Sequence, residues 1–229
     1  MKKLLFYFSK FEIMLWSLSV LMILVSFLIF DRENYLTLSA SLIGITALIF
    51  CAKGNPFGQI LMILFCLLYG MISLTFSYYG EMITYLGMSL PMAVFSLISW
   101  LHNPYKGNRS QVKVNTIEKK EPFFMCLLTI AVTVIFYFIL KHFHTANLLP
   151  STLSVATSFL AAYLTFRRSP YFALAYASND VVLIVLWIMA SLADPFYISV
   201  VVCFIAFLFH DIYGFVSWQR MKAYQRRNS

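Results

Sequence analysis

Charged residues are scarce in this sequence. Asp, Glu, Lys and Arg make up 11% of the 229 residues, whereas 61% of the residues are hydrophobic. A soluble domain of this length needs far more charge to cover its surface. The length accommodates about eight membrane-spanning helices of roughly 20 residues each, joined by short loops. Composition therefore predicts an integral membrane protein and leaves no segment for a soluble domain.

Metal-ligand and catalytic motifs are also missing. The four cysteines lie in or beside apolar runs and form no CxxC spacing, so we expect neither a disulfide framework nor a metal site. HExxH, GxSxG and a nucleotide-binding loop are absent. Two acids within apolar runs, Asp180 and Asp211, are the only candidates for catalysis in the membrane. We therefore expect no enzyme activity and no cofactor.

Basic residues exceed acidic ones, which gives a formal net charge of +8. Nucleic acid binding would need these residues on one polar face, but they stand at the ends of the apolar runs. We therefore interpret the positive charge as membrane topology and expect no nucleic-acid partner, with lipid as the surrounding medium.

The apolar runs are separated by clear breaks, such as Lys53-Gly54-Asn55-Pro56 and Arg167-Arg168-Ser169-Pro170. They do not alternate polar and apolar residues as strands of a membrane barrel would. Because backbone groups in lipid must be satisfied within each segment, all are predicted to be helices. The predicted spans are 11–30, 35–52, 57–79, 82–101, 122–141, 149–166, 171–192 and 195–218.

Lysine and arginine also predict the orientation. With a cytoplasmic N-terminus, only Arg32 and Lys141 of the 17 Lys and Arg residues fall outside the cell. Both termini and the polar loop 102–121 are then cytoplasmic, in a bacterial inner membrane. Glu81 is predicted to lie in a loop at the outer surface, and Glu12 to be an interfacial charge.

The second to fourth spans can be laid over the sixth to eighth. Leu38-Ser39 matches Leu153-Ser154, and Trp100 and Trp218 both close the last span of their set. Two like-oriented triplets need one more helix between them, which the fifth span supplies. This predicts a three-plus-one-plus-three arrangement with an extra first helix, and a substrate held between the repeats. The predicted segments are 1–34 (first helix), 35–101 (first repeat), 102–148 (loop and linker helix), 149–218 (second repeat) and 219–229 (basic tail).

Ionisable residues within a span are costly and usually face a cavity or a partner. On the seventh span, Tyr176, Asp180 and Trp187 share one helical face, with Asn179 beside them. Such a face suits a planar heteroaromatic ring with a hydroxylated sugar, bound by stacking and hydrogen bonds. The alternative is that the acids only join neighbouring helices. The full set of predicted substrate contacts is Tyr176, Asn179, Asp180, Trp187, His210, Asp211, Tyr213, Gln59, Tyr69 and Tyr85. A structural hydrogen bond is the alternative role of His210.

Three segments carry a resemblance to a known family. They are YGEMITYLGMSLPMAVFSLISW (Tyr79 to Trp100), Tyr176-Ala-Ser-Asn-Asp180, and His210-Asp-Ile-Tyr-Gly214 with Trp218. They resemble the nicotinamide riboside transporter family PnuC, over about residues 35–220. The family commonly shows a Trp-x3-Asn pattern where this chain has Tyr176 and Asp180, and this departure leaves the substrate open.

The resemblance implies a SWEET-like fold and facilitated diffusion of an unphosphorylated vitamin precursor, which a cytoplasmic kinase then phosphorylates and traps. Nicotinamide riboside is the first expectation. Thiamine, riboflavin and deoxynucleosides are the alternatives, as relatives of the family carry them. A membrane-embedded enzyme and a scaffold subunit are weaker interpretations, and a homo-oligomer is left open.

Overall fold

The computed structural model describes residues 7–75, 79–145 and 147–228. Within these residues, eight helical segments are long and apolar enough to cross a membrane. The prediction of an all-helical multi-span protein is therefore confirmed for the spans. The elements are α2 (Lys10–Phe30), α3 (Tyr35–Ala52), α4 (Phe57–Thr75), α5 (Tyr79–Ile83), the π-helix η1 (Thr84–Ser89), α6 (Leu90–His102), β1 (Pro104–Tyr105), β2 (Asn108–Val112), α7 (Glu121–His142), α8 (Leu148–Phe166), α9 (Phe172–Ser191), the 3-10 helix η2 (Pro195–Tyr197) and α10 (Ile198–Arg227).

Six spans form a closed ring around the centre of the molecule. In order, α3, α4, α6, α8, α9 and α10 each contact the next, and α10 contacts α3. We call α3, α4 and α5–η1–α6 the first triplet, and α8, α9 and α10 the second triplet. The triplets meet at two seams, α6 against α8 and α10 against α3.

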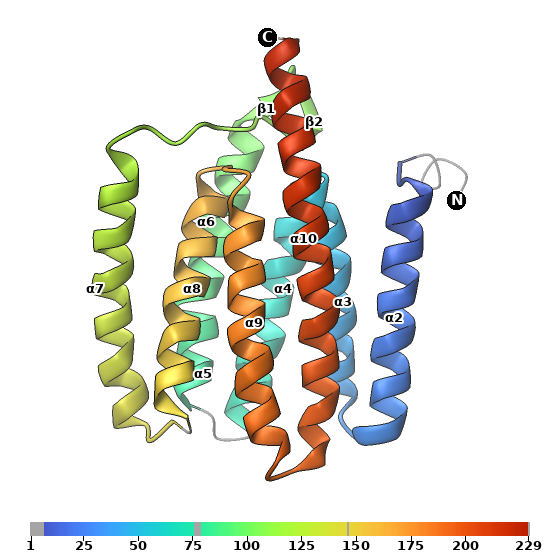
Figure 1. Cartoon of the computed structure of the whole chain (residues 1–229), viewed down its shortest axis with the longest axis vertical. Coiled ribbons are helices and arrows are strands. Elements are labelled where there is room, and N and C mark those ends of the chain that lie inside the picture. Colours follow the sequence, from blue (N-terminus) through green and yellow to red (C-terminus); the bar gives the residue numbers. More distant parts are fainter. Residues whose placement is uncertain (1–6, 76–78, 146, 229) are drawn as a thin grey trace.

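Two spans lie outside this ring, α2 beside α3 and α10, and α7 beside α8 (Figure 1). Only 22% of the apolar window of α2 and 11% of that of α7 are buried. Large apolar side chains such as Phe123 and Leu28 point outward from them. A lipid environment accounts for such surfaces, because lipid imposes no cost on exposed apolar groups.

The fourth span departs from the predicted continuous helix. Its middle, η1, is a π-helix in which the backbone N–H of Leu90 bonds to the carbonyl of Tyr85. Such π-helical turns insert an extra residue per turn and are frequent at functional sites. The turn packs closely on α4, since a Cβ atom on Gly70 would lie 2.4 Å from Leu86.

One end of the bundle carries β1, β2 and the last turns of α10, which extends beyond the neighbouring helices (Figure 1). We call it the hairpin end. The basic tail predicted from residue 219 onward is thus helical as far as Arg227. The polar loop 102–121 likewise contains an unpredicted hairpin, whose turn residues Lys106 and Gly107 both have positive φ, as tight hairpin turns require.

Each triplet is fastened to the other at the hairpin end by matching hydrogen bonds. Trp100, near the end of the first triplet, donates from Nε1 to the carbonyl of Thr165 at 2.9 Å. Trp218 in the second triplet donates to the carbonyl of Cys51 at 2.8 Å. The serines before them repeat the pattern, Ser99 to Phe166 and Ser217 to Ala52. Both tryptophans are fully buried, with ring centroids 5.3 Å apart.

The loop after α6 lies across both triplets. The N–H of Val112 bonds to the carbonyl of Gly54, and the N–H of Asn115 to the carbonyl of Arg168. Gln225 on α10 holds the segment between them, accepting from the N–H of Val114 and donating to the carbonyl of Val112. Gly54 and Arg168, both with positive φ, end the turns that follow the first helix of each triplet.

Both ion pairs among the described residues lie at this end. Glu12, which caps α2 together with Ser9, pairs with Lys53 at 3.2 Å. Glu121 at the start of α7 pairs with Arg167. Glu12 is thus buried and paired rather than an exposed interfacial charge. Each outer helix thus begins with an acid that pairs with the basic residue after the first helix of a triplet. For α2 that helix is α3, and for α7 it is α8.

Candidate functional site

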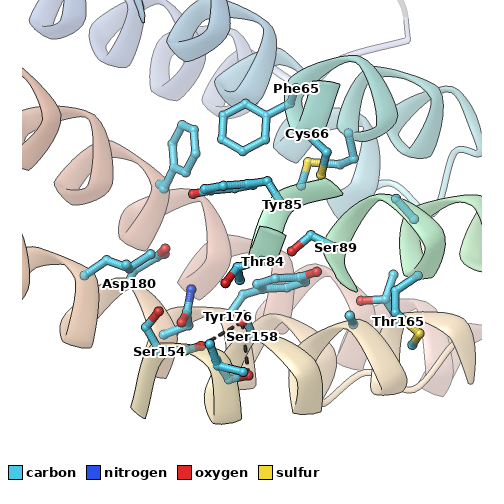
Figure 2. Close-up of a pocket in the computed structure, with 18 of the residues that line it drawn as sticks. Phe65, Cys66, Thr84, Tyr85, Ser89, Ser154, Ser158, Thr165, Tyr176 and Asp180 are labelled. Carbon is cyan, nitrogen blue, oxygen red and sulfur yellow. Dashed lines mark hydrogen bonds between the residues drawn. The ribbon is translucent and has the colours of Figure 1, made fainter. Parts of the chain in front are cut away.

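A cavity lies inside the ring, between the two triplets. Every span of the ring contributes to its lining, and α7 contributes Leu140. The walls are mainly apolar and aromatic, and Phe65, Tyr85, Tyr176 and Trp187 supply large rings. Figure 2 shows the rings of Tyr85, from the first triplet, and Tyr176, from the second, on either side of this space. Flat apolar walls with a few polar groups are typical of small-molecule sites.

The ionisable side chains that line the cavity include acids but no bases among the described residues. Three carboxyl side chains line the cavity, those of Glu81, Asp180 and Asp211. The lining contains no Lys, Arg or His side chain within the part of the chain that the structure describes. Both ion pairs described above lie at the hairpin end, away from these acids.

Asp180 and Asp211 come from neighbouring helices of the second triplet, α9 and α10. Both side chains are buried, with 3% and 4% exposure. Oδ2 of Asp180 has no hydrogen-bond partner among the described residues. Because buried polar atoms are nearly always hydrogen-bonded, this oxygen is available to a ligand.

Seven of the ten predicted contact residues line the cavity. Four of them, Tyr176, Asn179, Asp180 and Trp187, come from the face of α9 identified by helical spacing. The other three are Gln59 on α4, Tyr85 on η1 and Asp211 on α10. The structure thus brings these side chains from four segments of the chain to one space.

Two of these residues are oriented by neighbours. The hydroxyl of Thr157 donates to Oδ1 of Asn179 at 2.8 Å, which fixes the amide. The Trp187 ring lies 5.3 Å from that of Tyr197, and Trp187 Nε1 has no partner within the described residues. An indole N–H of this kind is a donor for a bound ligand.

The other three predicted residues are not part of the lining. Tyr69 lies behind the cavity wall, 4.7 Å from the ring of Phe65 and 5.1 Å from that of Tyr85. Tyr213 donates to Oε1 of Glu12 at 2.7 Å and so faces α2. His210 is fully buried, and neither of its ring nitrogens has a partner among the described residues. Their assignment as substrate contacts stays a prediction that the shape of the cavity does not support.

Glu81 lines the cavity although it is not among the predicted contact residues. It was predicted to be an outer loop residue, but it lies in the first turn of α5 and lines the cavity. Tight packing brings α5 inward, since a Cβ atom on Gly80 would lie 2.7 Å from Leu140 of α7. The sequence predicts a loop here because a Gly-Glu pair between apolar runs is equally compatible with a loop and with the start of a short helix.

A stripe of hydroxyl groups on α8 was missed. Ser151, Ser154, Ser158 and Thr165 line the cavity, and three of them are labelled in Figure 2. The hydroxyl of Ser158 donates to the carbonyl of Ser154 at 2.7 Å. The spacing of these residues places them on one helical face, so this signal was available in the sequence. Within the described residues, no group of three or more His, Cys, Asp or Glu side chains could hold a metal ion.

A multi-span helical protein with a cavity of aromatic walls and a few polar groups between two helix triplets has the architecture of a membrane transporter. The chain belongs to the family described as nicotinamide mononucleotide transporter, whose model matches residues 34–220. The predicted membership of the PnuC group is confirmed.

Two relatives place the chain within this group. A nicotinamide riboside transporter PnuC from Neisseria mucosa is 21% identical over 210 residues, covering 90% of this chain and 80% of the relative. A crystal structure of the vitamin B3 transporter PnuC has a TM-score of 0.81 at 20% identity, covering 95% of this chain and 94% of that chain. This second likeness shows that the fold is shared.

Proposed function

We propose that this protein carries an unphosphorylated, nucleoside-like vitamin precursor across the bacterial inner membrane by facilitated diffusion. Nicotinamide riboside is the first candidate, because a curated relative is a transporter of that solute. Thiamine, riboflavin and a deoxynucleoside are the alternatives. A cytoplasmic kinase then phosphorylates the solute and drives net uptake.

The composition of the cavity lining carries this proposal. Aromatic rings from both triplets offer stacking surfaces, and hydroxyl and amide groups offer hydrogen bonds to a sugar. The three carboxyl groups would repel a phosphate, and the lining has no cationic side chain to bind one within the described residues. A phosphorylated product is therefore a poor ligand and stays in the compartment where it forms.

The hairpin end faces the cytoplasm in this proposal. Both α2 and α7 begin there and α10 ends there (Figure 1). Basic side chains gather at this end, as the positive-inside rule requires of cytoplasmic loops; they are Lys53, Lys106, Arg109, Lys113, Arg167, Arg168, Arg220, Lys222, Arg226 and Arg227. The site is proposed to consist of Gln59, Tyr85, Tyr176, Asn179, Asp180, Trp187 and Asp211.

Uptake by proteoliposomes tests the proposal. Purified protein is reconstituted, and labelled nicotinamide riboside is added outside, with or without a nicotinamide riboside kinase and ATP inside. We expect the label to equilibrate without the kinase and to accumulate with it, while protein-free liposomes take up little. Labelled nicotinamide mononucleotide should not enter.

Two results would contradict specific parts of the proposal. Accumulation above the external concentration without the kinase would rule out facilitated diffusion. No uptake of nicotinamide riboside, with competition-sensitive uptake of thiamine, riboflavin or a deoxynucleoside instead, would select the alternative substrate.

A further inference from the structure

Among the described residues, the buried acids of the cavity have no positively charged partner. Asp180 and Asp211 lie on neighbouring helices, and both side chains are buried and line the cavity. A cation that binds beside these carboxyl groups favours their ionised, negatively charged form. The described part of the lining has no Lys, Arg or His side chain to balance it. Although His210 is next to Asp211 in the sequence, its ring is not part of the lining.

A buried, uncompensated charge is costly, and a ligand of opposite charge removes that cost when it binds. Oδ2 of Asp180 is available to contact a cationic ligand, because it is buried and has no hydrogen-bond partner among the described residues. Glu81 adds a third carboxyl from the first triplet. The electric potential within the cavity therefore favours cations over neutral solutes.

The aromatic walls act in the same direction. Figure 2 places Asp180 at the edge of the space between the Tyr85 and Tyr176 rings. A flat cation between such rings gains attraction from their electron-rich faces, an effect that strengthens away from water. A neutral ring of the same shape keeps the stacking contacts but loses both the cation–π and the carboxylate attraction.

We infer that Asp180 and Asp211 select solutes by charge. The transporter then prefers heteroaromatic rings with a fixed positive charge, such as an N-substituted pyridinium or thiazolium, over neutral rings. This inference rests on the proposed function and narrows its substrate class. Neutral nucleosides and neutral flavin rings are then poor substrates, although they offer similar flat surfaces.

The two redox forms of nicotinamide riboside make a matched pair of probes. The oxidised form carries a pyridinium cation, whereas the reduced form has a neutral dihydropyridine on the same sugar. We expect wild-type proteoliposomes to take up the oxidised form at least tenfold faster at equal, subsaturating concentration. Thiamine, a thiazolium cation, should compete better than riboflavin.

Asp180→Asn and Asp211→Asn, measured separately, test the residues. Each removes an acid while keeping shape and a hydrogen-bonding group, so the preference for the oxidised form should fall toward one. Uptake of the reduced form should be unchanged or faster, a change that mere loss of structure would not produce. Glu33→Gln removes an exposed acid outside the cavity and is the control.

The outcomes separate the inference from the proposed function. If wild-type protein takes up both redox forms equally well, charge selection is wrong while transport stands. Charge selection by these residues is also wrong if both Asn variants reduce the uptake rates of the oxidised and reduced forms by the same factor. If wild-type protein takes up neither form and none of the alternative solutes, the proposed function itself is wrong.

Discussion

The two triplets make matching contacts at the hairpin end of this protein but contribute different side chains to its cavity. At the hairpin end the triplets are equivalent, since Trp100 and Trp218 make the same bond to opposite partners. In the cavity they differ, because Asp180 and Asp211 come from the second triplet and Glu81 from the first. Fastening two halves needs like contacts on both sides, whereas a small asymmetric solute is recognised best by unlike ones. The two triplets therefore match at the hairpin end, where they are bonded to each other, and differ in the cavity.

The sharpest test of this contrast compares acids within the cavity. Asp180→Ala should reduce uptake of the transported solute by about 100-fold, because it removes a buried carboxyl group that is proposed to pair with a cationic solute. Glu81→Ala, in the other triplet, should cost about tenfold or less. Initial uptake rates in proteoliposomes measure both, normalised to protein that elutes as a single species in detergent. Equal losses would mean that the two triplets share recognition evenly.

The hairpin end should show the opposite behaviour under matched substitutions. Trp100→Phe and Trp218→Phe each leave a buried carbonyl without its donor and remove part of a packed ring. Each should lower the free energy of unfolding by about 2 kcal/mol, and by similar amounts. Thermal unfolding in detergent measures this. A loss confined to one tryptophan would show that the two bonds are not equivalent.

The two ion pairs allow a milder version of the same test. Lys53→Met and Arg167→Met each remove the basic partner of an acid at the start of an outer helix. Because Lys53 and Arg167 are partly exposed, each loss should be about 1 kcal/mol. Thermal unfolding at low and high salt measures it, with exposed Lys106→Met as the control. If both variants unfold at the wild-type temperature, packing alone holds the outer helices in place.

The smallest effect concerns Asp31, in the turn between α2 and α3. Burial raises the pKa of this carboxyl from 3.8 to about 6. The native state therefore binds its proton more tightly than the unfolded state, and this contribution to stability is lost as the pH rises through about 6. We expect Asp31→Asn to raise the unfolding temperature at pH 7.5 by about 1–2 °C, for about 0.5 kcal/mol. At pH 4 the difference should nearly vanish, and an unchanged difference would contradict the expected titration.

Several parts of the fold and site could be predicted from the sequence. The eight spans follow from hydropathy and breaks, because lipid permits few alternatives to a helix. The cavity-facing side of α9 follows from the spacing of Tyr176, Asp180 and Trp187, because helical geometry fixes which residues share a face.

The rest depends on which segments meet in space. Tyr213 shares a helix with Asp211 but faces Glu12, 201 residues away in the sequence, and periodicity cannot identify such a partner. The π-helical turn and the inward position of Glu81 arise from packing against α4 and α7. The hairpin crosses both triplets through backbone bonds that leave no pattern in the side chains.

The reciprocal tryptophan bonds also define how one triplet would behave alone. A single triplet would carry a Ser-Trp pair in its last helix and two unused carbonyl groups at the end of its first helix. A second identical copy, turned about an axis along the membrane normal, would satisfy both sets at once, which is the self-complementary geometry of a twofold homodimer. The present chain is bonded internally as such a dimer. Because both triplets belong to one polypeptide, both sets of bonds form within a single chain, while the cavity-lining side chains of the two triplets differ.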